Sequence, residues 1–331
     1  MTAVLAVLAV ALLAWLGYRW RDARGAERRR HQLEDALKHL FEQEYRGRFG
    51  SLASLGGALR LPDRAVVALV GRMATQGLVR ADGQEFRLTP DGERLALQVV
   101  RAHRLLERYF ADEAQLPLLK VHKAAERGEH ALTPAEADRL SASLGHPSVD
   151  PHGDPIPTRD GALAPPSGTP VTAWEPGRVG RIVHLEDEPE ISFAQIVAEG
   201  LRLGQVVRLV EQTPERLVLS DGENEFRLAP AVAANVFVAA APEARVDPDV
   251  IRLADLPEGA AAVVVRLDQA CQGFSRRRLM DLGFTDGARV EPALSTFAGD
   301  PRAYRVRGTL IALRRDQASH VLVRQSAAPA A

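Results

Sequence analysis

Residues 101–110 are RAHRLLERYF and residues 121–130 are VHKAAERGEH, and these two stretches decide the fold. In the first stretch, His103 and Glu107 are four residues apart. In the second, imidazoles and carboxylates recur at offsets of four, seven and eight, at His122, Glu126, Glu129 and His130. Such offsets place side chains on one face of a helix. The pattern therefore predicts two neighbouring helices whose ligand atoms converge on a divalent cation, and the earlier acid Asp35 could reach the same place.

The composition argues against several classes of function. The 331 residues suffice for two or three domains, and 42 basic residues nearly balance 43 acidic ones, so no global field directs the chain to nucleic acid. Aromatic residues make up 5%, too few for a platform that stacks single-stranded bases. The single Cys271 fits a reducing compartment and is expected in a domain core. We find no nucleophile–base pair and no nucleotide cradle, so we expect no enzyme.

The N-terminal segment suggests a membrane anchor. Residues 3–17 carry no charge, and Trp15, Tyr18 and Trp20 stand where an interfacial aromatic belt would. The run is shorter than the ~20 residues of a typical spanning helix, and a cleaved signal peptide is the competing interpretation. Because the following RWRDARGAERRR holds six arginines and two acids, we predict a single-pass anchor at residues 1–20 in the inner membrane, with the bulk of the protein cytoplasmic.

The next segment has the order of a winged helix-turn-helix, which we place at residues 28–100. Helical spacing in residues 31–45 precedes two short helices separated by a turn at 61–63. A hairpin turns on Asp82-Gly83, and Thr89 with Pro90 begins a long helix. We expect DNA phosphates to be contacted by four arginines, namely Arg64, Arg72, Arg80 and Arg87.

The fold class predicted for the whole chain is multidomain. After the transmembrane helix and the helical winged domain come a helical metal-binding and dimerisation domain at 101–150 and a linker rich in proline and glycine at 151–171. An internal repeat then relates residues 172–242 to residues 250–325. Each copy has the length of a small all-β SH3-like barrel.

These residues resemble the diphtheria toxin repressor and manganese transport regulator family of metal-dependent regulators. The resemblance covers roughly residues 31–160 through QGLV, FRLTPDGERLA, RAHRLLERYF, the GEH of the second stretch and DPHGDPIP. The last repeat, with RRRLMDLGFTDGARVE, is similar to a FeoA domain, the SH3-like protein associated with bacterial ferrous iron uptake.

The resemblance implies two metal sites that take Fe²⁺ or Mn²⁺. His103, Glu107 and His122 fall on the family's ancillary site, to which an acid of the EDEPE stretch at 186–190 could be added. Asp35, Glu126, Glu129 and His130 fall on the primary, regulatory site, where Lys38 replaces a second acid. Zn²⁺ would also bind such ligands by intrinsic affinity. We interpret His152 as a turn residue, and His31 and His39 as solvated.

The resemblance also implies a homodimeric, metal-dependent transcriptional regulator that binds double-stranded operator DNA and is held at the membrane by its N-terminus. One feature argues against recognition of DNA bases by hydrogen bonds from side chains. The chain has Pro62, Ala65 and Ala68 where the family carries Ser, Thr and Gln. The alternative function is therefore a metal-sensing accessory protein of ferrous iron transport, which contacts the transporter through its FeoA-like domain without binding DNA.

Overall fold

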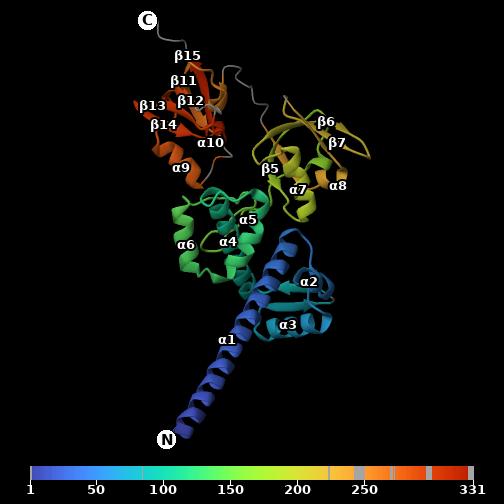
Figure 1. Cartoon of the computed structure of the whole chain (residues 1–331). Coiled ribbons are helices and arrows are strands. Elements are labelled where there is room, and N and C mark those ends of the chain that lie inside the picture. The colour runs from blue at the N-terminus through green and yellow to red at the C-terminus, as the bar shows by residue number, and fades with distance from the viewer. Residues whose placement is uncertain are drawn as a thin grey trace. The chain divides into compact units, whose positions relative to one another are not determined.

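The structure, a computed structural model (Figure 1), describes residues 2–83, 85–222, 224–241, 250–268, 271, 273–295 and 300–326. It divides into two compact units that are interleaved along the chain. The first unit comprises residues 1–103, 126–134 and 157–166. The second comprises residues 104–125, 135–156 and 167–331.

The first unit holds the helix–helix–hairpin segment. The helices α2 (Leu52–Leu59) and α3 (Asp63–Thr75) are followed by the strands β2 (Val79–Asp82) and β3 (Glu85–Leu88). The short β1 (Gly50–Ser51) pairs with β3, which gives the strand order β1-β3-β2. The strands β2 and β3 are antiparallel and place Arg80 opposite Arg87.

Local sequence explains where these helices begin and end. Ser51 and Ser54 form a capping box at the start of α2, in which each backbone N–H donates to the hydroxyl of the other residue. The helix α2 ends at Arg60, which has a left-handed backbone conformation. Thr89 Oγ1 accepts from Gly92 N–H at the start of α4 (Pro90–Asp112). Under these elements lies a core of buried apolar side chains that includes Leu37, Leu40, Leu55, Leu69 and Met73.

The predicted transmembrane helix is wrong. Within the part of the chain that the structure describes, no helix is both long and apolar enough to cross a membrane. The apolar segment is the beginning of α1 (Thr2–Tyr45), a helix that continues through the arginine-rich stretch into the winged segment. The uncharged run, residues 3–17, rises only about 22 Å as a helix, against about 30 Å of bilayer hydrocarbon. The single-pass inner-membrane localisation rested on this segment and is wrong with it.

The second unit contains the rest of α4, most of α5 (Leu118–Gly128), nearly all of α6 (Pro134–Ser143) and two β domains. The β-rich C-terminal region therefore follows a helical one, as predicted. The first β domain is a six-stranded sheet of order β4-β9-β5-β6-β7-β8 with two helices. Its elements are β4 (Thr169–Pro170), β5 (Val179–Leu185), α7 (Glu190–Glu199), β6 (Val206–Gln212), β7 (Leu217–Ser220), β8 (Glu225–Leu228), α8 (Pro230–Ala233) and β9 (Val236–Ala240).

The second β domain repeats this topology strand for strand, in the order β10-β15-β11-β12-β13-β14. In each copy the second strand changes register once against its antiparallel partner. The shift lies between Ile182 and His184 where β5 pairs with β9, and between Val264 and Arg266 where β11 pairs with β15. The elements of the second copy are β10 (Val250–Arg252), β11 (Ala261–Leu267), α9 (Gly273–Asp281), β12 (Arg289–Ser295), β13 (Arg302–Val306), β14 (Thr309–Leu313), α10 (Arg315–Ser319) and β15 (Val321–Ser326).

The proline- and glycine-rich segment before these domains has tertiary partners. Val149 and Pro155 form an isolated antiparallel bridge. In the first unit, Arg101 donates to the carbonyl of Pro157, and the Tyr45 hydroxyl donates to the carbonyl of Ala164 at 2.7 Å. Parts of the predicted linker are therefore held against the helical region.

Candidate metal centres

A first cluster of titratable side chains lies in the first unit, between α1 and the 3₁₀ turn η1 (Glu129–Ala131). The helix α1 supplies the adjacent residues Glu34 and Asp35, and Lys38 one helical turn later. The 3₁₀ turn η1, which follows α5 directly, supplies Glu129 and His130. The last member comes from α4. The first cluster consists of Glu34, Asp35, Lys38, His103, Glu129 and His130.

His130 lies between two carboxylates of α1. Its Nδ1 is 2.6 Å from Glu34 Oε2, and its Nε2 is 3.0 Å from Asp35 Oδ1. Burial alone would lower the pKa of His130, but the hydrogen bonds with Asp35 and Glu34 outweigh it and raise the pKa to about 9. His31 stacks on the same ring at 4.3 Å between centroids, so it is a packing partner as well as a partly exposed residue.

Glu129 is the most buried carboxylate of the first cluster, with 3% of its surface exposed. Its Oε2 accepts a hydrogen bond from Lys38 Nζ at 2.9 Å and lies in close contact with His103 Nδ1. Lys38 Nζ is also 2.9 Å from that imidazole nitrogen. Burial raises the pKa of Glu129, but the Lys38 charge and the His103 contact oppose it and hold the pKa at about 2.

A second cluster lies entirely in the second unit and consists of Glu107, His122, His152 and Asp187. These four residues come, in that order, from α4, from α5, from the turn after α6 and from the loop after β5. His122 Nδ1 is 3.1 Å from Glu107 Oε1 and 2.8 Å from Asp187 Oδ2. His152 Nε2 is 3.7 Å and 3.8 Å from the same two oxygens. Ligand atoms of Glu107, His152 and Asp187 all lie within 4.8 Å of one another.

The carboxylate of Asp187 is held ionised by imidazoles. Burial raises the pKa of Asp187, but the hydrogen bond with His122 and the neighbouring His152 outweigh it and bring the pKa to about 2. Glu107 is 2% exposed, so its charge is well removed from water. A buried acid and a partly buried acid that face two imidazoles offer the donor set of a transition-metal site.

The loop DPHGDPIP fixes His152. Asp150 Oδ1 accepts hydrogen bonds from the backbone N–H groups of His152, Gly153 and Asp154, each at 2.9 Å. Gly153 has a φ of 100°, and a Cβ there would lie 2.2 Å from the carbonyl oxygen of Val183, so only glycine fits. The loop therefore sets where the imidazole of His152 stands.

His152 provides the test of fit for a metal ion. It is 1% exposed, and neither ring nitrogen has a hydrogen-bond partner among the described residues. Leaving a buried polar group without a hydrogen bond costs about 1–3 kcal/mol. An imidazole nitrogen that faces two carboxylates fits a divalent cation, which would bind the lone pair of that nitrogen once it carries no proton.

The structure brings together members of each expected ligand set. Asp35, Glu129 and His130 come together as predicted, and Glu107 lies beside His122. His103 contacts Glu129 in the first unit, and the boundary between the units falls directly after it in α4. Glu126 is exposed at the end of α5 and is not among the donors that converge there.

The sequence interpretation missed the roles of two contributors, His152 and Glu34, and named only the stretch that contains a third, Asp187. Asp187 lies in the acidic stretch that was expected to add a ligand, but no spacing singles it out. His152 was interpreted as a turn residue, which it is, and its imidazole also reaches the second cluster. Glu34 was not considered, although its position one helical turn before Lys38 placed it on the same face.

The four arginines predicted to contact DNA differ in their exposure and in their contacts with other residues. Arg64 and Arg80 are exposed, and Arg72 is half-buried on α3. Arg87 is committed to the hairpin, because its Nε lies 2.8 Å from Asp82 Oδ2 and its guanidinium lies 3.9 Å from the Phe49 ring centroid. The exposed face of α3 is apolar at its centre, where Val67 is 55% exposed.

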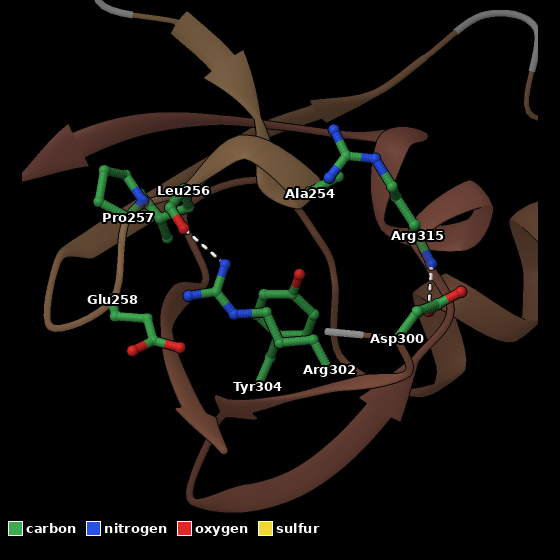
Figure 2. Close-up of a pocket in the computed structure, with 8 residues that line it drawn as sticks. All are labelled: Ala254, Leu256, Pro257, Glu258, Asp300, Arg302, Tyr304 and Arg315. Atoms are coloured by element: carbon green, nitrogen blue, oxygen red, sulfur yellow. Dashed lines mark hydrogen bonds between the residues drawn. The ribbon is translucent and has the colours of Figure 1, made fainter. Parts of the chain in front are cut away.

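Figure 2 shows a pocket of about 260 Å³ in the second β domain. Arg302 Nη1 donates to the carbonyl of Leu256 at 2.7 Å, and Arg315 N–H donates to Asp300 Oδ1. The lining sets Arg302 and Arg315 against Glu258 and Asp300, so its charges balance and select neither anions nor cations.

Comparisons with known proteins agree with this geometry. The family model described as the iron dependent repressor metal binding and dimerisation domain matches residues 89–158, and the FeoA domain model matches residues 251–325. The chain is 31% identical over 187 residues to the diphtheria toxin repressor of Corynebacterium diphtheriae, an alignment that covers 53% of this chain and 83% of that protein. The chain belongs to the diphtheria toxin repressor family.

Two further comparisons fit membership of the diphtheria toxin repressor family. The iron-dependent repressor IdeR of Mycobacterium leprae is 29% identical over 198 residues, covering 53% of this chain and 86% of that protein. The solved structure of a manganese-dependent transcriptional repressor in complex with manganese aligns with a TM-score of 0.57 and 27% identity, over 62% of this chain and all of the other. The chain is a metal-dependent transcriptional repressor of this family, which confirms the prediction that it is a regulator and no enzyme.

Proposed function

We propose that this repressor is a homodimer that binds operator DNA in response to Fe²⁺ or Mn²⁺, and that the second cluster is its metal site. The observation that carries the proposal is His152, a buried imidazole that faces two carboxylates and has no hydrogen bond among the described residues. The relatives named above as iron-dependent and manganese-dependent repressors support the choice of metals.

Four side chains of the second cluster would hold the ion. Glu107 and Asp187 offer carboxylate oxygens, and His122 and His152 offer imidazole nitrogens. Oxygen and nitrogen ligands in this mixture suit Fe²⁺ and Mn²⁺. A bound divalent cation supplies two positive charges to two carboxylates that are well removed from water. Asp150 holds the His152 loop in place, and Phe193 packs edge-on against the ring at 4.9 Å between centroids.

Phosphate contacts would dominate DNA binding. Arg64 and Arg80 are exposed on α3 and β2, and guanidinium groups suit phosphate oxygens. The exposed centre of α3 offers Val67 and Ala68, which have no hydrogen-bond donors for base edges. Sequence preference would therefore rest on DNA shape more than on direct base contacts.

A gel-shift titration tests the proposal. The full chain is mixed with a palindromic DNA fragment from upstream of its own gene, in Mn²⁺ or anaerobic Fe²⁺, and with chelator as the control. We expect a shift that needs metal, weakens steeply as salt rises, and is lost in Glu107→Gln. A shift that persists undiminished in chelator would contradict metal dependence.

One observation favours a second candidate function. The apolar centre of α3 suits a protein contact as well as DNA, and the FeoA domain model matches residues 251–325. The second candidate is a metal-sensing accessory protein of ferrous iron transport that acts through its FeoA domain. Absence of any gel shift in Mn²⁺ or Fe²⁺, with metal binding intact, would support it.

A further inference from the structure

We propose that Lys38 is the resident cation of the first cluster, so that the second cluster alone takes a metal ion. The inference rests on the proposed function, because it assigns the metal response of this repressor to one of its two clusters. It concerns residues of the first unit only.

The first argument is the position of the Lys38 ammonium group. Lys38 Nζ lies 2.9 Å from Glu129 Oε2 and 2.9 Å from His103 Nδ1, so it contacts Glu129, one of the three candidate ligands that come together in this cluster. Its side chain is 13% exposed, and that of Glu129 is 2% exposed. Removing one partner of such a buried pair leaves an uncompensated charge, so the ammonium is fixed where it stands.

The second argument is the chemistry of that group. A protonated lysine has three donors and no lone pair, so it cannot be a ligand. A divalent cation placed on Glu129 would lie within a few ångströms of this ammonium, and the repulsion between like charges is strong at a poorly hydrated site. Metal and lysine therefore compete for one carboxylate.

The third argument is the arrangement around His130. Both of its ring nitrogens lie within hydrogen-bond distance of carboxylates, Nδ1 near Glu34 and Nε2 near Asp35. Both contacts hold the His130 ring against α1. The first cluster thus links η1 to α1 through its own side chains.

In the first cluster an ammonium group is the partner of Glu129, and the second cluster differs in this respect. The partners of Asp187 there are the imidazoles of His122 and His152, which are themselves metal ligands when neutral. A metal ion at that place would gain donors, whereas at the first cluster it would have to displace an ammonium group. Metal ions would therefore select the second cluster.

The test is the number of Mn²⁺ ions bound by the full chain. Protein freed of metal is titrated with MnCl₂ by calorimetry, and bound manganese is counted after gel filtration. We expect one tightly bound ion per chain. Glu107→Gln should weaken it at least tenfold, whereas Asp35→Asn, on a half-exposed side chain of the first cluster, should leave the affinity within about twofold.

The possible results distinguish failure of this inference from failure of the proposed function. Two ions per chain, or one ion that Asp35→Asn weakens as much as Glu107→Gln does, would overturn the inference and leave the proposed function intact. A chain that binds no Mn²⁺ or Fe²⁺ would overturn both.

A charge reversal tests Lys38 directly. Lys38→Glu should allow a second Mn²⁺ ion to bind, whereas Lys120→Glu, the same change at an exposed position of α5, should leave one. Circular dichroism checks that each variant folds. A folded Lys38→Glu chain that still binds one ion would overturn the role of Lys38, and if that variant does not fold, the wild-type count and Asp35→Asn still decide.

Discussion

Single residues decide which cluster can receive a cation. In both clusters buried acids face imidazoles, and the difference between them is one ammonium group, that of Lys38 beside Glu129. His152 differs from Lys38, because a neutral imidazole carries no charge. Its ring nitrogens also have no hydrogen-bond partner among the described residues, so that a lone pair remains for a metal ion. Its place in the fold depends on the backbone of its own loop.

Replacing His152 with alanine should weaken Mn²⁺ binding by roughly 10- to 100-fold, because one imidazole donor is lost while both carboxylates remain. Calorimetry on the full chain measures the change. His39→Ala is the matched control, since His39 contacts Ser54 in the first unit and lies in neither cluster. Equal affinities for the two variants would remove His152 from the metal site.

Gly153→Ala should destabilise the fold by about 4 kcal/mol or more, because it combines a strained φ with a clash against the carbonyl of Val183. Gly177→Ala separates the two causes, since Gly177 has a φ of 83° but open space around it, and should cost about 1 kcal/mol. Urea unfolding of both variants measures the difference. Similar losses would mean that the loop shifts to admit the methyl group.

The sequence predicted most of these residues but not all of their contacts. Helical spacing placed Glu129 and His130 near Asp35, because the offsets fix a face of a helix. The contact of His103 Nδ1 with Glu129 could not be predicted in this way. Spacing specifies the face of one helix, whereas the partner across the interface depends on tertiary packing. His152 and Asp187 lie in loops, where no periodicity applies.

At the scale of elements, the internal repeat was visible in the sequence and reappears as two sheets with the same strand order. The N-terminal helix was the failure. An uncharged run followed by arginines satisfies the pattern of a membrane anchor, but it is the start of one helix of 44 residues that ends in the winged segment. The composition of residues 3–17 does not show where the helix that contains them ends.

Among the arginines of the winged segment, Arg80 should matter most for DNA affinity. Arg80→Ala should weaken binding equally for all sequences and reduce the slope of log affinity against log salt by about 1, because one phosphate contact is lost. Arg94→Ala, on an exposed residue of α4 paired with Asp91, is the control for net charge. Salt-dependent gel shifts measure the slopes, and identical slopes would place DNA elsewhere.

In the second β domain, Cys271 should resist alkylation at pH 8. The side chain is 2% exposed, and burial raises the pKa of the thiol to about 11, so the reactive thiolate is scarce. Mass spectrometry after iodoacetamide treatment should find no label on the folded chain and complete labelling in guanidinium. Rapid labelling of the folded protein would show that the core of this domain opens.

At the scale of the whole molecule, the metal clusters and the second β domain are separable. No residue of either cluster comes from residues 250–326. A chain truncated after Ala240 should therefore bind Mn²⁺ with the same stoichiometry and affinity as the full chain, measured by calorimetry. A lost or weakened site would mean that the last domain supports the second cluster.

The interleaving of the two units has a consequence for how this protein can be cut, copied or exchanged. The backbone crosses from one unit to the other after residues 103, 125, 134, 156 and 166. No single break ahead of residue 167 can release an intact half, so the winged segment and the helical region form one inseparable piece of chain. Recombination could trade the last β domain freely but not the first, because the first β domain supplies Asp187 to the second cluster, and a hybrid spliced inside the helical region would have to preserve every crossing at once.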